Sequence, residues 1–121
     1  MNFDMKTEAL ADDAFIVSLS GEVDLYTAPE FKQELLELID NGAKSVIVDL
    51  SGTTFIDSTT LGVLVSGVKR LRPSDGRLSL VCSDRSITTT FEITGLDRVF
   101  TIHGTRVEAV EQLQAGSSPA S

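Results

Sequence analysis

Residues 45–72, SVIVDLSGTTFIDSTTLGVLVSGVKRLR, determine the fold class of this chain. The stretch opens with a nearly continuous apolar run, SVIVDL, which is typical of a strand that is central in its sheet or covered on both faces. From residue 58 onward, apolar side chains recur at helical spacing, which predicts an amphipathic helix over residues 58–72. A buried strand followed by such a helix is typical of the β-α-β units that build parallel sheets.

The same alternation is expected along the rest of the chain. Periodic β-prone segments predict further strands at residues 1–10, 14–20, 77–82 and 99–102. Capping and stop signals predict further helices at residues 27–41, 86–94 and 105–114. The expected order is β-β-α-β-α-β-α-β-α, which describes an α/β domain with parallel β-α-β units after an opening hairpin.

The helix at residues 27–41 has the clearest boundary signals. Thr27 is its expected N-cap, and Glu30 completes a Thr-x-x-Glu capping box. Pro29 falls in the first turn, where a missing N–H costs nothing. Gly42 follows the last residues of the segment and predicts a left-handed stop.

Length and composition fit one folded domain. The chain has 121 residues, of which 41% are hydrophobic and 23% are charged, so disorder is excluded as the state of the whole chain. We expect the domain to cover residues 1–115. Residues 116–121 contain only Gly, Ser, Pro and Ala and are expected to form a disordered tail.

The chain is acidic, because 10 Lys and Arg residues stand against 18 Asp and Glu residues, a formal net charge of −8. This charge disfavours binding to nucleic acid or to an anionic bilayer, so the expected partner is an electropositive protein surface. The single cysteine, Cys82, cannot form an internal disulfide and fits a reducing compartment. Because there is no apolar run of membrane-spanning length and no signal-peptide pattern, we expect a cytoplasmic location and no membrane contact.

The residue types that carry catalysis are few. There is no Gly-rich phosphate loop, no Cys-x-x-Cys pair and no histidine cluster, so we expect no cofactor and no metal site, and an enzyme is the least favoured class. A functional pair of Cys82 and His103 is conceivable. A lone cysteine is more often a small buried hydrophobe, however, and His103 is expected in a solvent-facing loop.

Asp49 ends its strand in the sequence VIVDLS, which resembles the receiver domains of two-component systems. Receiver domains hold Mg²⁺ with further acidic residues at the end of their first strand. Here Asp12 and Asp13 precede a strand instead of following one. We therefore expect Asp49 to face solvent or to cap the following loop.

The most informative stretch for function is FIDSTTLG, residues 55–62. Phe55 and Ile56 are expected to anchor the loop to the core, and either Asp57 or Ser58 would serve as the N-cap of the following helix. A hydroxyl at a helix start is exposed on a rigid backbone. A phosphate on Ser58 would add about −1.5 to −2 charges at a terminus that tolerates anions. Such a change would switch the binding of a partner without unfolding the domain.

A second acidic element, Glu22-Val23-Asp24, follows the second expected strand. In a β-β-α-β-α order, the loops after the second and third strands can lie at the same edge of the sheet. Glu22 and Asp24 could then lie near Asp57 and Ser58, although two solvated acids in a turn explain the local sequence equally well.

Three motifs in order resemble the STAS domain family, and within it the bacterial anti-sigma factor antagonists. LSGEVD with Thr27-Ala28 is similar to the family's G-E-hydrophobic-D…T-A element. VIVDL followed by FIDS is similar to its central strand and D-S signature. FEITGL, at residues 91–96, is similar to its late F-x-x-x-G-L element. The resemblance covers nearly the whole chain.

The resemblance implies a mixed central sheet of four or five strands, with about four helices packed mainly on one side. It also implies partner switching: the unphosphorylated protein binds an anti-sigma factor that is a serine kinase and thereby releases a sigma factor. The kinase then uses ATP to phosphorylate Ser58, which weakens the complex, and a PP2C-type phosphatase restores the binding form. The implied partner-binding residues are Glu22, Asp24, Tyr26, Thr27, Asp57, Ser58, Thr59, Thr60 and Gly62.

One position departs from the family signature D-S-S/A-G-L-G, because Thr60 stands where a glycine is usual. A β-branched residue adds volume and stiffens the helix start. Thr59 is a second possible phosphate acceptor. The departure leaves room for an alternative function, a constitutive interaction module or a small-ligand sensor with the same fold.

Overall fold

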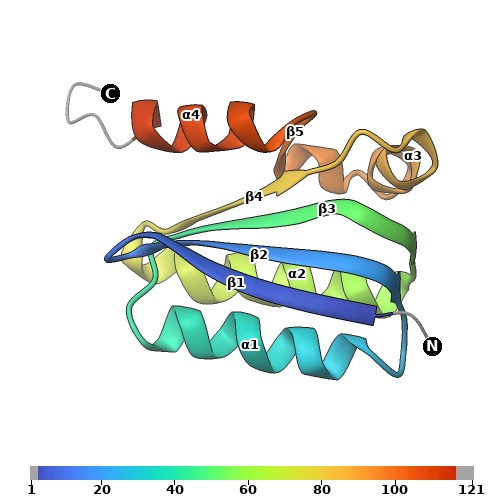
Figure 1. Ribbon diagram of the computed structural model, residues 1–121, viewed down its shortest axis with the longest axis horizontal. Coiled ribbons are helices and arrows are strands. Elements are labelled where there is room, and N and C mark those ends of the chain that lie inside the picture. The colour runs from blue at the N-terminus through green and yellow to red at the C-terminus, as the bar shows by residue number, and fades with distance from the viewer. Residues whose placement is uncertain (1–2, 117–121) are drawn as a thin grey trace.

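The computed structural model describes residues 3–116 as a five-stranded sheet with helices on both of its faces (Figure 1). The strands are β1 (Phe3–Ala11), β2 (Ala14–Val23), β3 (Ser45–Ile56), β4 (Arg77–Val81) and β5 (Thr101–His103). The helices are α1 (Ala28–Asp40), α2 (Ser58–Leu71), α3 (Arg85–Thr94) and α4 (Arg106–Gly116), with short 3-10 turns η1 (Arg72–Ser74) and η2 (Leu96–Arg98). The predicted order of elements is confirmed.

The strands lie in the order in which they occur in the chain, β1-β2-β3-β4-β5. β1 is antiparallel to β2, and every later pair is parallel. The α/β class, with an opening hairpin followed by β-α-β units, is therefore confirmed. β3 is the central strand, which explains its apolar run, because residues 46–50 are buried whichever face of the sheet they point to.

The two faces of the sheet carry layers of different size. α1 and α2 cover one face, and α4 lies on the other (Figure 1). The larger core contains residues of β2, β3 and β4 together with Phe31 of α1, Leu64 of α2 and Phe91 of α3. The smaller core joins Ala109 of α4 to three buried strand residues on the opposite face. The expected packing of helices mainly on one side is thus observed.

β2 and β3 run further than predicted, to residues 23 and 56 instead of 20 and 50. Their pairing continues through two register shifts, and Gly21 adopts a positive φ of 86° beside the second one. Gly52 permits the close approach, because a Cβ atom there would lie 2.9 Å from the Cβ of Ser20. Bulges of this kind interrupt the alternation of buried and exposed residues along a strand, so sequence periodicity does not predict these extensions.

Both ends of α1 were given boundary predictions, with different outcomes. The left-handed stop is confirmed, because Gly42 has a φ of 107° directly after the C-cap Asn41. The capping box is wrong, because the side chain of Thr27 makes no cap hydrogen bond to the helix. At the other end of the chain, α4 includes Gly116, and the rest of the predicted tail, residues 117–121, lies outside the described residues.

The tight crossing at Gly52 predicts a specific sensitivity to substitution. Gly52→Ala would force the new methyl group against Ser20 and the carbonyl oxygen of Leu19, and we expect it to lower the free energy of unfolding by about 1–3 kcal/mol. Urea denaturation would measure the change. Gly62→Ala is the matched control, because a Cβ there meets no atom within 4 Å; it should stabilise the protein by about 0.5–1 kcal/mol. Equal effects of the two substitutions would contradict the close approach.

Candidate functional site

The start of α2 lies where β2 and β3 end, and the side chain of Asp57 caps it. The Asp57 side chain is the N-cap and accepts hydrogen bonds from the backbone N–H groups of Thr59 at 3.0 Å and Thr60 at 3.2 Å. Of the two predicted caps, the structure therefore selects Asp57. Ser58 is exposed, and its hydroxyl makes no hydrogen bond to any group in residues 3–116. Its side chain is available at the surface while its backbone is fixed by its neighbours.

Thr60 ties the start of α2 to the end of β2. Its hydroxyl donates a 2.8 Å hydrogen bond to the carbonyl oxygen of Val23, and the residue is fully buried. Thr60 was expected among the partner-contacting residues, but a buried side chain offers no surface to a partner. Its extra volume, compared with the glycine usual in the family, lies inside the protein and does not obstruct approach to Ser58.

The loop between β2 and α1 is closed by Asp24. Its carboxylate accepts hydrogen bonds from the N–H groups of Tyr26 at 2.9 Å and Thr27 at 3.1 Å. The Thr27 hydroxyl turns back into the loop, where it donates to the carbonyl oxygen of Glu22 at 3.0 Å and accepts from the N–H of Asp24 at 2.9 Å. This competing use of the hydroxyl explains why the predicted capping box with Glu30 does not form.

The two acidic segments meet at one edge of the sheet, as predicted. Val23 pairs with Ile56 in the β2–β3 ladder, and Glu22 pairs with Phe55. The hydroxyl of Thr60 bridges to Val23, which stands between Glu22 and Asp24 in the chain. The carboxylates of Glu22, Asp24 and Asp57 thus belong to neighbouring segments around Ser58, and they give this edge a negative character.

Three exposed apolar residues adjoin these acids; Tyr26 was expected at the partner surface, whereas Leu25 and Phe55 were not. Leu25 is 61% exposed, Tyr26 is 76% exposed and Phe55 is 50% exposed. Phe55 was expected to anchor the loop to the core together with Ile56, but only Ile56 is buried. The alternation of a strand could have predicted this difference, because the successive side chains of Phe55 and Ile56 point to opposite faces of the sheet.

A groove between α1 and α2 begins next to Ser58. It is lined by Ala28, Pro29, Lys32, Thr59, Gly62, Val63 and Ser66. Gly62 is exposed in this lining, and no side chain fills the space above it. The predicted site residues Thr59 and Gly62 therefore share one concave surface.

The conceivable pair of Cys82 and His103 is not formed. Val81 pairs with His103 in the ladder and packs on the α4 face, whereas Cys82 belongs to the core on the opposite face. Burial raises the pKa of the Cys82 thiol, as expected for a structural cysteine. His103 is the last residue of β5 and is half-buried, so the prediction that it lies in a solvent-facing loop is wrong.

Within residues 3–116 no group of His, Cys, Asp or Glu side chains is arranged to hold a metal ion.

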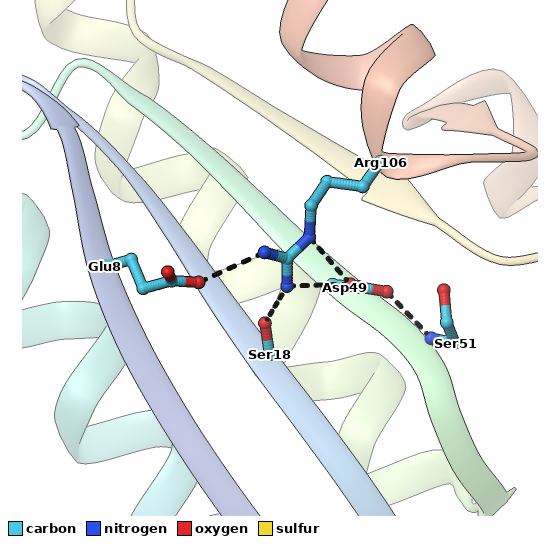
Figure 2. Close-up of polar contacts among 5 residues, drawn as sticks. All are labelled: Glu8, Ser18, Asp49, Ser51 and Arg106. Carbon is cyan, nitrogen blue, oxygen red and sulfur yellow. Dashed lines mark hydrogen bonds and ion pairs between the residues drawn. The ribbon is translucent and has the colours of Figure 1, made fainter.

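Of the two expected roles of Asp49, exposure to solvent is wrong, because the residue is 7% exposed, and capping of the following loop is confirmed, because its carboxylate accepts from the N–H of Ser51. Arg106 at the start of α4 engages the same carboxylate (Figure 2). The Asp49 carboxylate accepts from the Arg106 guanidinium at 3.2 Å and 3.4 Å and from the N–H of Ser51 at 2.9 Å. The same guanidinium reaches Ser18 at 2.7 Å and Glu8 at 3.1 Å. Arg106 therefore attaches α4 to β1, β2 and β3, and Asp49 is its buried partner, a structural role that argues against a receiver-type acceptor.

Comparison with known proteins agrees with this architecture. The STAS domain model matches residues 6–109. An anti-sigma-B factor antagonist of Staphylococcus epidermidis is 36% identical over 109 residues, which are 89% of this chain and 100% of that protein. The crystal structure of an anti-sigma factor antagonist from Mycobacterium paratuberculosis has a TM-score of 0.84 and 26% identity, covering 93% of this chain and 95% of that one.

The chain belongs to the STAS domain family. The resemblance to bacterial anti-sigma factor antagonists, inferred from the three motifs, is confirmed over most of its length. The fold is also that of Bacillus SpoIIAA, solved in its phosphorylated form, with a TM-score of 0.74, 21% identity and coverage of 91% of this chain and 99% of that one. None of the helices in residues 3–116 is long and apolar enough to cross a membrane.

The assignment of the cap to Asp57 predicts that two neighbouring substitutions differ in their effect on stability. Asp57→Ala removes the acceptor of two backbone N–H groups, and we expect it to lower the free energy of unfolding by about 0.5–2 kcal/mol. Ser58→Ala removes no hydrogen bond and should leave that energy within about 0.5 kcal/mol of its starting value. Thermal unfolding followed by circular dichroism would compare them, and a larger loss for Ser58→Ala would show that the cap is misassigned.

The position of Arg106 predicts that it stabilises the fold more than an ordinary surface arginine. Arg106→Gln would leave the buried Asp49 carboxylate without its cation. We expect the free energy of unfolding to fall by about 1–3 kcal/mol, which is less than for a fully buried pair because the arginine is partly exposed. Arg70→Gln is the control, since the Arg70–Asp40 pair is about half exposed on both sides and should contribute at most about 1 kcal/mol. Urea denaturation of both variants is the measurement, and equal losses would argue against a special role for Arg106.

Proposed function

We propose that this protein is an anti-sigma factor antagonist that works by partner switching. In its unmodified form it binds an anti-sigma factor that is a serine kinase, and the bound sigma factor is released. Phosphorylation of Ser58 weakens that complex. The observation that carries the proposal is the position of Ser58, exposed at the start of α2 and free of the hydrogen bonds that fix the helix.

The electrostatics of the site support a switch in binding without a change of fold. A phosphate on Ser58 would bring about −1.5 to −2 charges to a helix N-terminus, where the positive end of the helix dipole favours anions. The fold therefore tolerates the modification. A partner seated over Glu22, Asp24 and Asp57 meets a much larger negative charge, and a partner surface fitted to the unmodified site no longer matches it.

The partner surface is best described by the exposed groups of the site. Glu22, Asp24 and Tyr26 belong to the segment whose Val23 is hydrogen-bonded to Thr60, two residues after Ser58, and Thr59 and Gly62 line the groove. Thr27 and Thr60 act indirectly, because their hydroxyl groups hold the loop and the helix start in place. The partner face would be cationic with an apolar component that packs on Tyr26.

The names of the relatives support these roles. The Staphylococcus epidermidis protein is an anti-sigma-B factor antagonist, and SpoIIAA has been solved in unphosphorylated and phosphorylated forms. By the same scheme, ATP belongs to the kinase and a PP2C-type phosphatase removes the phosphate. The protein itself would then be a substrate and a ligand in the cytoplasm, with no cofactor and no catalytic activity of its own.

Phosphorylation is tested with the purified anti-sigma factor kinases of the same organism and ATP. Mass spectrometry should find one added phosphate on Ser58, none in Ser58→Ala, and an unchanged yield in Thr59→Ala. Phosphate on Thr59 alone, or no phosphate with any of the kinases, would contradict the assignment.

Binding is tested by calorimetry with the same kinases in the absence of ATP. Ser58→Ala should bind like the unmodified protein, because the hydroxyl adds no charge. Ser58→Asp should bind more weakly, by at least about threefold, since a carboxylate carries part of the charge of a phosphate. Equal affinities of Ser58→Asp, Ser58→Ala and the phosphorylated protein would refute the electrostatic mechanism.

A further inference from the structure

The groove between α1 and α2 has one feature that the switch at Ser58 does not use, a cation without a counterion. Lys32 lines the groove together with Thr59, the residue that follows Ser58. It is the only basic residue of α1, and it forms no ion pair within residues 3–116. The helix neighbours three and four positions away, residues 28, 29, 35 and 36, carry no charge, so no acid on α1 itself can neutralise it.

At Gly62 the backbone of α2 is exposed to the same groove. It lies inside α2, where glycine costs about 0.5–1 kcal/mol relative to alanine. Packing does not require it, because a Cβ at this position would meet no atom within 4 Å. By contrast, Gly67 of the same helix is packed against Leu35 and Leu78. The space over Gly62 therefore serves no contact within the described chain and leaves the helix backbone open to close approach.

We propose that this groove is a docking seat for a segment of the anti-sigma factor, in which a carboxylate pairs with Lys32 and a small residue packs on Gly62. The inference depends on the proposed function, because it specifies that partner's chemistry. Its basis is charge complementarity: an isolated cation borders an edge that is otherwise acidic at Glu22 and Asp57. A partner with cations over these acids and one acid over Lys32 can dock in one orientation only, so Lys32 would determine specificity.

The test measures affinity for the purified anti-sigma factor kinases of the same organism by calorimetry without ATP, at 0.1 M and 1 M NaCl. At low salt, Lys32→Ala should weaken binding about two- to fivefold and Lys32→Glu about tenfold, and both losses should shrink at high salt because the ion pair is screened. Gly62→Gln should weaken binding at least about tenfold at both salt concentrations, because it fills the space that the partner occupies. The salt dependence separates the charged contact from the steric one.

Two controls keep these results interpretable. Lys69→Glu makes the same change of charge near the far end of α2 and should bind like the unaltered protein. Thermal unfolding should show that Gly62→Gln is at least as stable as the unaltered protein, since glutamine favours helix more than glycine does.

The inference and the proposed function fail in different ways. If Lys32→Glu and Gly62→Gln bind as tightly as the unaltered protein while Ser58→Asp binds weakly, the docking seat is refuted and the switch stands. A Lys69→Glu variant as weak as Lys32→Glu would likewise refute a specific role for Lys32. If the unaltered protein binds none of the kinases, the proposed function fails and the docking seat fails with it.

Discussion

The hydroxyl of Thr60 bonds to the carbonyl oxygen of Val23 at the point where β2 and β3 end together. Through this contact the loop after β2 and the start of α2 become one surface, although they are far apart in the chain. The contact depends in turn on the long parallel pairing of β2 with β3, which passes two register shifts and the close crossing at Gly52. Without that pairing, Asp24 and Asp57 would cap separate turns, and Ser58 would have no acidic surroundings.

Much of this architecture could be predicted because its signals are local. The apolar run at residues 45–50 marked the central strand, and the stop at Gly42 marked the end of α1. The start of α2 could also be predicted, since a D-S pair before an amphipathic helix indicates a cap, and either residue could supply it. Choosing between Asp57 and Ser58 needed coordinates, because both side chains can accept the same hydrogen bonds.

In each error a side chain takes a different partner or a different face from the one that its local sequence pattern predicts. Thr27 has the right sequence for a capping box, but its hydroxyl is used by Glu22 and Asp24. Asp49 has the composition of a solvated strand end, yet Arg106, 57 positions away, holds it in a buried pair. Phe55 was assigned to the core because it is apolar, whereas the continuation of β3 turns it outward. Only the Arg106 contact lies beyond a short window of sequence; the bonds of Thr27 are local, but a sequence pattern does not tell which of several nearby partners its hydroxyl takes.

The separation of tasks between Asp57 and Ser58 has a consequence for the life of the protein in the cell. Because the carboxylate of Asp57 caps the helix, the adjacent hydroxyl contributes no hydrogen bond to folding, and the proposed phosphate on Ser58 would leave the stability of the domain nearly unchanged. The modified molecules of the proposed switch would then be no more exposed to proteolysis than the unmodified ones. They would form a lasting store of protein, which dephosphorylation would restore to the binding form without new synthesis.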